Sequence, residues 1–299
     1  MARKEQLNIA EYHLHQDQPQ QLQFSVHDLH IYLDEHQANT TRPHIHSFYQ
    51  IIWFKSGKGK HYVDFKAYEV FDNAIFFIAK NQVHYFDHGK HYEGVLIHFN
   101  EEFLTGSGNE LNLFLKFSLF NNPYQLPSCC VGASVNKTLD EYLRQIKAEL
   151  PHVDQFGQKE LLKTYLKAFL IQVQRRKYEY EQTNGNTPFM VDEKRLQLLQ
   201  LSNLIEENYS KNLSVADYAK RMHISTRTLS DLTHMVVNKT PSQLIQERII
   251  LEAKRLLLHS HLNINQIGYH LGFEDPSYFV KYFKKHTQTA PSVFRKSVR

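Results

Sequence analysis

Cysteine is scarce in this sequence and long apolar runs are absent, and both features limit the class of protein. The two cysteines, Cys129 and Cys130, are adjacent, so they cannot form the disulfide framework of a small secreted domain. No stretch approaches the ~18 consecutive apolar residues that a membrane-spanning helix needs. The polar residues 1–18 lack the apolar core of a signal peptide. We therefore expect a cytoplasmic protein that does not bind a membrane.

The chain has 299 residues, which is enough for two domains with separate cores. Its net charge of +4 is unevenly distributed. Residues 192–299 contain 16 Lys and Arg against 10 Asp and Glu, whereas residues 1–191 contain 19 against 21. The basic C-terminal third indicates a polyanionic partner, although many enzyme domains carry a similar charge.

The N-terminal part of the chain has the pattern of β-structure. Between about residues 20 and 100, aromatic and β-branched runs are broken by turns such as Gly-Lys-Gly at 57–59. This pattern predicts a small barrel or a two-sheet jelly roll. Two helical patterns follow at 134–150 and 159–177, and the second has a wide apolar face. That face fits an intramolecular helical hairpin or a dimer interface, and the two can coexist.

A segment at 179–194 is rich in Thr, Asn, Gly and Pro, as linkers are. We therefore predict an α+β protein of two domains, with an all-α domain after the linker. The predicted limits are 1–135 for the β-barrel, 136–180 for the helical pair, 181–191 for the linker and 192–299 for the helical domain.

The helical domain contains an internal repeat. Residues 213–224, LSVADYAKRMHI, align with residues 262–273, LNINQIGYHLGF, and residues 225–244 align with 275–294. Each copy has the spacing of a capped helix, a tight turn and a second capped helix, which is a helix-turn-helix. A joining stretch of 20 residues would span ~30 Å as one helix, close to the ~34 Å of one DNA turn. The spacing predicts two recognition helices on one face of a DNA duplex.

The second copy resembles the AraC/XylS family of bacterial transcription regulators over roughly residues 192–299. Family members carry Ile-Ala-x-x-x-Gly-Phe, Ser-Tyr-Phe, Phe-Lys-Lys, Gly-x-Thr-Pro and a closing aromatic-Arg. The matching positions here are Ile267, Gly268, Gly272, Phe273, Ser277, Tyr278, Phe279, Phe283, Lys284, Lys285, Pro291, Phe294 and Arg295. Gly268 departs from the family's Ala, and Gln288 from its Gly, which affects local stability rather than the resemblance.

The resemblance implies which residues face DNA. The first recognition helix is expected from about Ser225 to Val236, with Thr226, Arg227, Ser230, Asp231 and His234 facing outward. Arg227 is suited to a bidentate contact with guanine. Asp231 could accept from a cytosine amino group or orient Arg227.

The second recognition helix is expected to begin at Asp275 as N-cap, with an aromatic stripe of Tyr278, Phe279, Tyr282 and Phe283 facing inward. The expected DNA-facing residues of this helix are Pro276, Ser277, Lys281, Lys284 and Lys285. Of these, Ser277 and Lys281 suit base edges, and the last two lysines suit phosphates.

The N-terminal domain resembles the cupin-like sensor of the same family. His44, His46, Gln50 and Gly57 match the cupin spacing, and His84 matches the final residue of its second motif. Three imidazoles could bind a divalent metal, but Gln50 replaces the expected carboxylate. We therefore expect no metal and no cofactor. The expected effector-binding residues are His44, His46, Gln50, Trp53, Tyr62 and His84.

Two functions remain open from the sequence. The favoured one is a dimeric, non-enzymatic transcription regulator that binds promoter DNA. A small-molecule effector in the barrel would control it, and RNA polymerase would be a further partner. The alternative is a metal-dependent cupin enzyme with a DNA-binding tail. Gln50 and the altered second motif argue against the enzyme.

Overall fold

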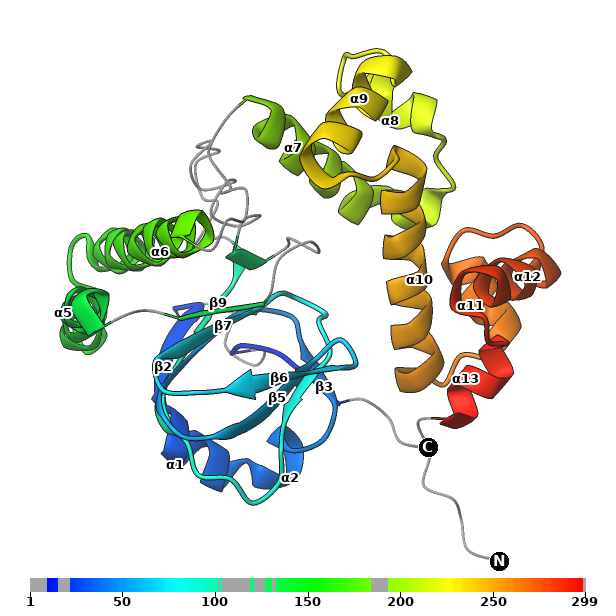
Figure 1. The fold of residues 1–299 in the computed structure, drawn as a ribbon. Coiled ribbons are helices and arrows are strands. Elements are labelled where there is room, and N and C mark those ends of the chain that lie inside the picture. The colour runs from blue at the N-terminus through cyan, green and yellow to red at the C-terminus, as the bar shows by residue number, and fades with distance from the viewer. Residues whose placement is uncertain are drawn as a thin grey trace, which may run out of the picture. The chain divides into compact units, whose positions relative to one another are not determined.

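A computed structural model describes residues 10–15, 22–101, 103, 119–120, 127–130, 133–183 and 193–297. The chain forms two compact units, one of Ala10–Met190 and one that contains Val191–Arg299 (Figure 1). No helix among the described residues is long and apolar enough to cross a bilayer.

The N-terminal unit is built from two five-stranded sheets, as the sequence predicts. One sheet has the strand order β1-β3-β8-β5-β6 and the other has the order β10-β7-β4-β9-β2. The strands are β1 Ala10–Tyr12, β2 Phe24–Asp28, β3 His44–His46, β4 Tyr49–Ser56, β5 Gly59–Val63, β6 Lys66–Val70, β7 Ala74–Ile78, β8 His84–Phe86, β9 Glu93–Phe99 and β10 Ser128–Cys130.

The core of this unit lies between the sheets, because successive side chains of a strand point to opposite faces. Ile52 and Phe54 of β4 pack there with Phe76 of β7, and Val63 and Phe86 come from the other sheet. The ring of Phe54 is 5.5 Å from that of Phe76 and 6.2 Å from that of Phe86. The interior therefore combines aliphatic side chains with several aromatic rings.

Two short helices interrupt the region, about residues 20–100, in which the sequence predicts β-structure. Helix α1 covers Leu29–Glu35 and α2 covers Gln37–Thr40. Asp28 caps α1 by accepting hydrogen bonds from the backbone N–H groups of His30 and Ile31, at 3.0 and 3.2 Å. An Asp before an apolar segment is a local helix signal, so the β prediction was wrong here.

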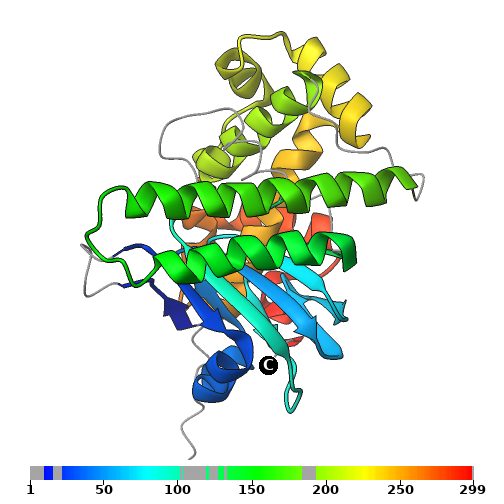
Figure 2. The same cartoon turned by 90° about the vertical axis from the view of Figure 1, so that its left-hand side faces the viewer.

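The predicted helical pair is an intramolecular hairpin of α5 (Ala133–Glu149) and α6 (Gln158–Thr183), which lie side by side over one sheet (Figure 2). Phe169 of α6 meets Trp53 of β4 with ring centroids 5.7 Å apart. Lys55 of β4 pairs with Asp140 of α5. The apolar face of α6 is wide because it packs against both α5 and the sheet. Helix α6 extends to Thr183, inside the predicted linker.

The C-terminal unit is all helical, as predicted. Its helices are α7 Glu193–Asn208, the 3-10 turn η2 Tyr209–Lys211, α8 Val215–Arg221, α9 Thr226–Val237, α10 Pro241–His259, α11 Ile264–His270, α12 Pro276–Thr287 and α13 Pro291–Ser297. Capping boxes begin three of them, at Ser214, Thr240 and Asn263, in agreement with the capped helices expected from the repeat. Helix α10 joins the lobe of α8 and α9 to the lobe of α11 and α12 (Figure 1).

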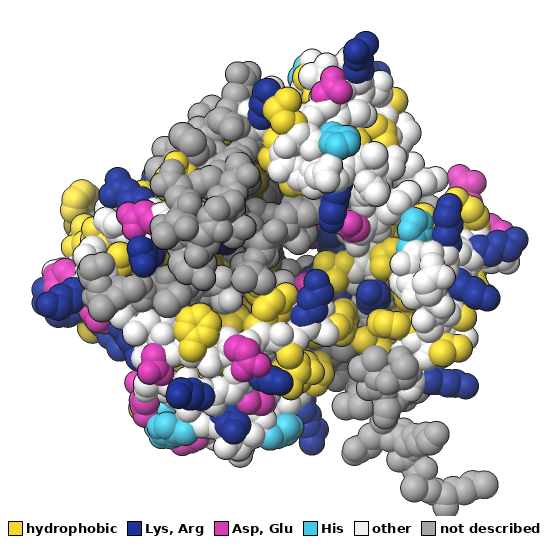
Figure 3. Space-filling model, in the orientation of Figure 1, with side chains coloured by type: hydrophobic (Ala, Val, Ile, Leu, Met, Phe, Trp, Pro, Cys, Tyr) yellow, Lys and Arg dark blue, Asp and Glu magenta, His cyan; other side chains and the backbone are white. Residues whose placement is uncertain are grey.

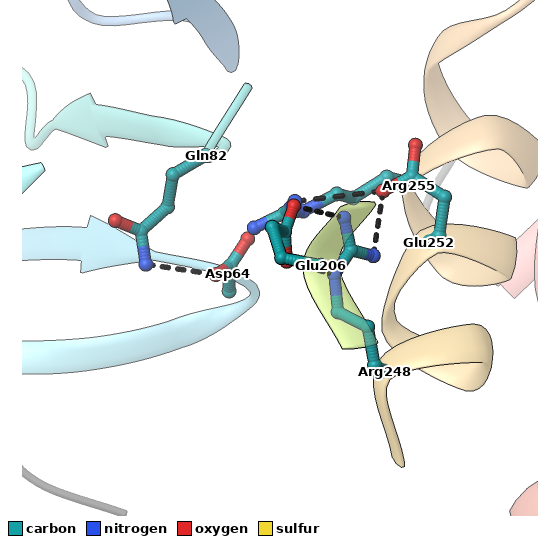
Figure 4. A network of polar contacts seen from close by, with 6 residues as sticks. All are labelled: Asp64, Gln82, Glu206, Arg248, Glu252 and Arg255. Carbon is teal, nitrogen blue, oxygen red and sulfur yellow. Dashed lines mark hydrogen bonds and ion pairs between the residues drawn. The ribbon is translucent and has the colours of Figure 1, made fainter. Parts of the chain in front are cut away.

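A cluster of charged side chains holds α10 against α7 (Figure 4). Arg248 of α10 donates two hydrogen bonds to the Glu206 carboxylate, at 2.6 and 2.8 Å, and one to Glu252 at 2.9 Å. Its guanidinium also lies 4.0 Å from the ring centre of Tyr209. These partners stabilise the positive charge of Arg248, whose side chain is only 13% exposed.

Arg295, the arginine of the closing motif, has a structural role. It donates hydrogen bonds to the carbonyl oxygens of Leu257 and Leu262, at 2.8 and 2.7 Å. These carbonyls flank the end of α10, where backbone acceptors lack helical partners. Arg295 therefore holds the end of α10 and the loop after it.

Candidate nucleic-acid interface and histidine cluster

Helix α9 presents a polar face to solvent. Ser225 caps it by accepting a hydrogen bond from the Thr228 N–H at 3.0 Å. Leu229, Leu232 and Thr233 are buried and fix the inner face. The residues predicted to face DNA are all exposed: Thr226, Arg227, Ser230, Asp231 and His234. They lie on one helix face because their spacing follows the helical repeat.

Helix α12 repeats this arrangement with a more basic face. Asp275 accepts from the Ser277 N–H at 2.8 Å, and Pro276 occupies the first turn. Phe279 and Phe283 are fully buried. Of the five residues of α12 that are predicted to face DNA, Pro276 is half-buried. The other four are exposed: Ser277, Lys281, Lys284 and Lys285. Lys and Arg side chains gather at the outer edge of this lobe (Figure 3).

Tyr278 is a correction to the predicted aromatic stripe. Its side chain is 60% exposed, whereas the adjacent Phe279 is buried. Tyr278 is one position, or ~100° of helix rotation, away from the inner face defined by Phe279 and Phe283. It therefore stands beside Ser277 on the solvent side, and the sequence analysis did not include it among the DNA-facing residues.

A cluster of buried histidines lies in the N-terminal unit. His44 and His46 of β3 and His84 of β8 each expose 3% or less of their surface. The ring centroids of His44 and His84 are 4.2 Å apart, and those of His46 and His84 are 4.8 Å apart. One ring nitrogen from each of the three lies within 4.8 Å of the others. The sequence predicted these three together, and the structure brings them together.

Burial keeps these imidazoles neutral near pH 7. It lowers the pKa of His44 to about 4, although the hydrogen bond to the Arg42 carbonyl acts in the opposite direction. Burial, and then the neighbouring imidazoles, hold the pKa of His46 and of His84 well below the ordinary 6.5. A neutral imidazole has a lone pair on one ring nitrogen.

Two further buried histidines flank the cluster and were missed by the sequence analysis. His61 of β5 lies 5.4 Å from the ring of His84, and His98 of β9 lies 6.1 Å from that of His46. Burial lowers the pKa of His61 to about 3, with a smaller effect from His44. The alternation of side chains along a strand could have identified His61. His61 and Tyr62 are adjacent in β5, so only one of the two can face the interior.

Gln50 is buried on β4, and its side-chain oxygen has no hydrogen-bond partner among the residues that the structure describes. Trp53 does not join it. Three positions along a strand reverse the face, and Trp53 packs against Phe169 of α6. Tyr62 also faces away from the histidines, because it stacks on Tyr85 at 4.4 Å in the partner strand β8. Both predicted placements were wrong.

Two family models match the chain. An AraC-like ligand binding domain matches residues 27–170, and a helix-turn-helix domain matches residues 218–297. The first coincides with the two-sheet domain and helical hairpin, and the second with α8 to α13.

Curated relatives match most of the chain. It is 26% identical to the HTH-type transcriptional activator RhaS of Pectobacterium atrosepticum and 24% identical to RhaS of Escherichia coli O157:H7. Both alignments cover 84% of this chain and 86% of the relative. Among solved structures, fatty acid-bound ToxT from Vibrio cholerae matches with a TM-score of 0.41 and 18% identity, over 91% of this chain and 94% of that one.

Proposed function

Because the chain belongs to the AraC family of transcription regulators, we propose that it activates transcription from promoters that it binds through α9 and α12. The observation that carries this proposal is the duplicated lobe. Two capped helices with exposed polar faces are joined by the single 19-residue helix α10. At 1.5 Å per residue α10 spans ~28 Å, which suits two major-groove segments on one face of DNA.

Within this proposal the residues divide into base contacts and phosphate contacts. Arg227 can make a bidentate contact with guanine, and Ser277 and Lys281 reach base edges. Lys284 and Lys285, one helical turn further along α12, contact phosphates. Such a division gives α9 more sequence selectivity and α12 more of the salt-dependent affinity.

The N-terminal unit is proposed to bind the effector at His44, His46, Gln50 and His84. These four polar side chains are buried in an interior built mainly of aliphatic and aromatic residues. An effector changes DNA affinity only if it binds one arrangement of the protein better than another. The proposal gives this unit a sensing role and no catalytic one.

A homodimer is part of the proposal. The turn between α5 and α6 exposes the apolar side chains of Val153 and Phe156, and Leu161 is exposed on the first turns of α6. Exposed apolar side chains grouped at one end of a hairpin suit contact with a second copy. RNA polymerase is the further partner that an activator needs at a promoter.

Footprinting tests the function directly. Duplexes selected by the full chain from a random library should show two protected segments about one helical turn apart on one face of DNA. A single protected segment, or protection that does not depend on salt, would contradict the use of both helices. Sedimentation of the chain and of Phe156→Ser tests the dimer, which the substitution should weaken.

A further inference from the structure

The spacing of the nitrogens of His46 and His84 is that of two ligands on one metal ion. Nε2 of His84 lies 3.4 Å from Nδ1 of His46. A good hydrogen bond from an N–H group is ~2.9–3.0 Å long, so this pair is too far apart for a strong one. Two nitrogens bound at ~2.0–2.1 Å to a tetrahedral ion are ~3.3 Å apart. The observed separation therefore fits metal ligation better than hydrogen bonding.

His44 completes the set with a fixed tautomer. Its Nδ1 is 2.8 Å from the backbone carbonyl oxygen of Arg42. A carbonyl oxygen only accepts, so Nδ1 carries the proton and Nε2 carries the lone pair. Histidine ligands in metal sites are commonly oriented by such a hydrogen bond from the other ring nitrogen. One ring nitrogen from each of the three histidines lies within 4.8 Å of the others, so ligation through these nitrogens requires an approach of at most ~1.5 Å.

Aromatic rings pack against two of the three imidazoles. Phe48 stacks on His46 with centroids 4.4 Å apart and planes at 8°. Tyr12 meets both His44 and His46 edge-on, at 5.6 and 5.9 Å. Gln50 on β4 of the other sheet, in register with His98, has a buried side-chain oxygen without a hydrogen-bond partner among the described residues. Neutral nitrogen donors in an apolar shell suit Zn²⁺, Co²⁺, Ni²⁺ or Cu²⁺ rather than Mg²⁺ or Ca²⁺.

The cluster also lies at a weak seam in its sheet. Strands β3 and β8 have one register pair, His44 with His84. Strand β1 is joined to the sheet through β3. An ion held by both strands would cross-link this seam, and would stabilise the arrangement of β1, β3 and β8 over any other.

From these relationships we infer that His44, His46 and His84 form a binding site for a divalent first-row transition metal ion, and that this ion is the effector. The inference reverses the expectation of a metal-free barrel that Gln50 suggested. Its regulatory half rests on the function proposed above, whereas the metal site stands on the geometry alone.

Metal binding is measured first on the full chain after chelator treatment. With Zn²⁺ as the probe, elemental analysis should give one ion per chain, and the X-ray absorption spectrum should show imidazole ligands. Co²⁺ should give the visible absorption of a low-coordinate site, and Zn²⁺ should raise the thermal midpoint. A chain that retains no ion after desalting and shows no thermal shift would overturn the site.

Matched variants locate the ion. His84→Gln and His44→Gln should lose the bound ion and the thermal shift. His61→Gln and His98→Gln, which change buried histidines outside the three-residue set, should retain both. His91→Gln tests the second group of possible ligands, His30, His91 and Glu93; loss of the ion in this variant, with retention in His84→Gln, would overturn the assignment. Circular dichroism of the metal-free variants separates loss of a ligand from loss of the fold.

DNA affinity then tests the regulatory half. With a selected duplex at fixed ionic strength, Zn²⁺ should change the Kd of the wild-type chain by about 5- to 150-fold and leave that of His84→Gln unchanged. An ion that binds stoichiometrically without changing the Kd would overturn its role as effector. Failure of the metal-free and metal-loaded chains to bind any DNA would instead contradict the proposed function, while elemental analysis would still decide the metal site.

Discussion

Gly272 lies against the backbone carbonyl of Ser210, so closely that a side-chain methyl at residue 272 would stand 2.0 Å from that oxygen. Gly272 belongs to the turn between α11 and α12, and Ser210 belongs to η2 before the first lobe. The φ angle of +85° at Gly272 also favours glycine. The Gly-Phe step of the family pattern thus has two physical reasons, a left-handed backbone and a close approach.

We expect Gly272→Ala to destabilise the C-terminal unit by more than ~2 kcal/mol, because it adds a backbone clash to the strain of positive φ. Thermal unfolding measures the change. Gly157→Ala is the matched control: its φ is +77°, but no atom lies within 4 Å of the added methyl. Equal losses in the two variants would show that the contact with Ser210 contributes nothing.

Glu206→Ala should destabilise the same unit by ~1–2 kcal/mol, because it leaves Arg248, whose side chain is 13% exposed, without two of its hydrogen bonds. The loss is limited because the Glu206 side chain is 47% exposed. Urea unfolding gives the free energy. Glu247→Ala removes an ion pair with a similarly exposed carboxylate, but its cation, Lys239, is 33% exposed rather than 13%, and the variant should have a smaller effect. If both variants unfolded at the same urea concentration, Arg248 would not depend on its partner.

Arg227→Ala and Lys285→Ala should weaken DNA binding in different ways. Loss of a bidentate base contact should cost ~1–3 kcal/mol at one base pair and relax preference there. Loss of a phosphate contact should weaken all duplexes alike and reduce the salt dependence. Binding to a library of duplexes at several salt concentrations distinguishes these patterns, and identical behaviour of the two variants would refute the division.

A fragment from Met190 to Arg299 should fold and bind DNA without the N-terminal unit, because both lobes and α10 lie inside it. Its affinity should fall steeply as salt rises, since each phosphate contact releases counterions. Fluorescence anisotropy at several salt concentrations checks this. The fragment should show no response to the effector of the full chain; a response would place the sensor in the C-terminal unit.

Features encoded locally could be predicted from the sequence. The caps at Ser214, Thr240, Asn263 and Asp275 depend on residues three positions or fewer apart, and all four are present in the structure. The apolar face of 159–177, in contrast, fitted a hairpin or a dimer interface equally from the sequence, and Leu166 on that face is 1% exposed inside one chain. The sequence alone could not show that a sheet covers α6, because that contact joins distant segments.

The histidine cluster illustrates the same limit. His44 and His46 are predictable neighbours in a strand, but their contact with His84 depends on the register of β3 against β8. Strand parity would have excluded Trp53, since it is three positions from Gln50 and so faces the opposite side. Aromatic character alone does not place a side chain in the barrel; its position along the strand decides which face it takes.

Helix α10 fixes rotational phase as well as separation. Each residue of a helix contributes ~1.5 Å of length and ~100° of rotation. One residue inserted between Pro241 and His259 would therefore turn α12 by ~100° about the axis of α10 and away from the DNA face, with both lobes intact. Seven residues would restore the direction to within ~20° but add ~10 Å. Substitutions can change the base preference of each lobe separately. The length of α10, in contrast, fixes the angle between the two lobes, and both lobes must bind DNA at that angle.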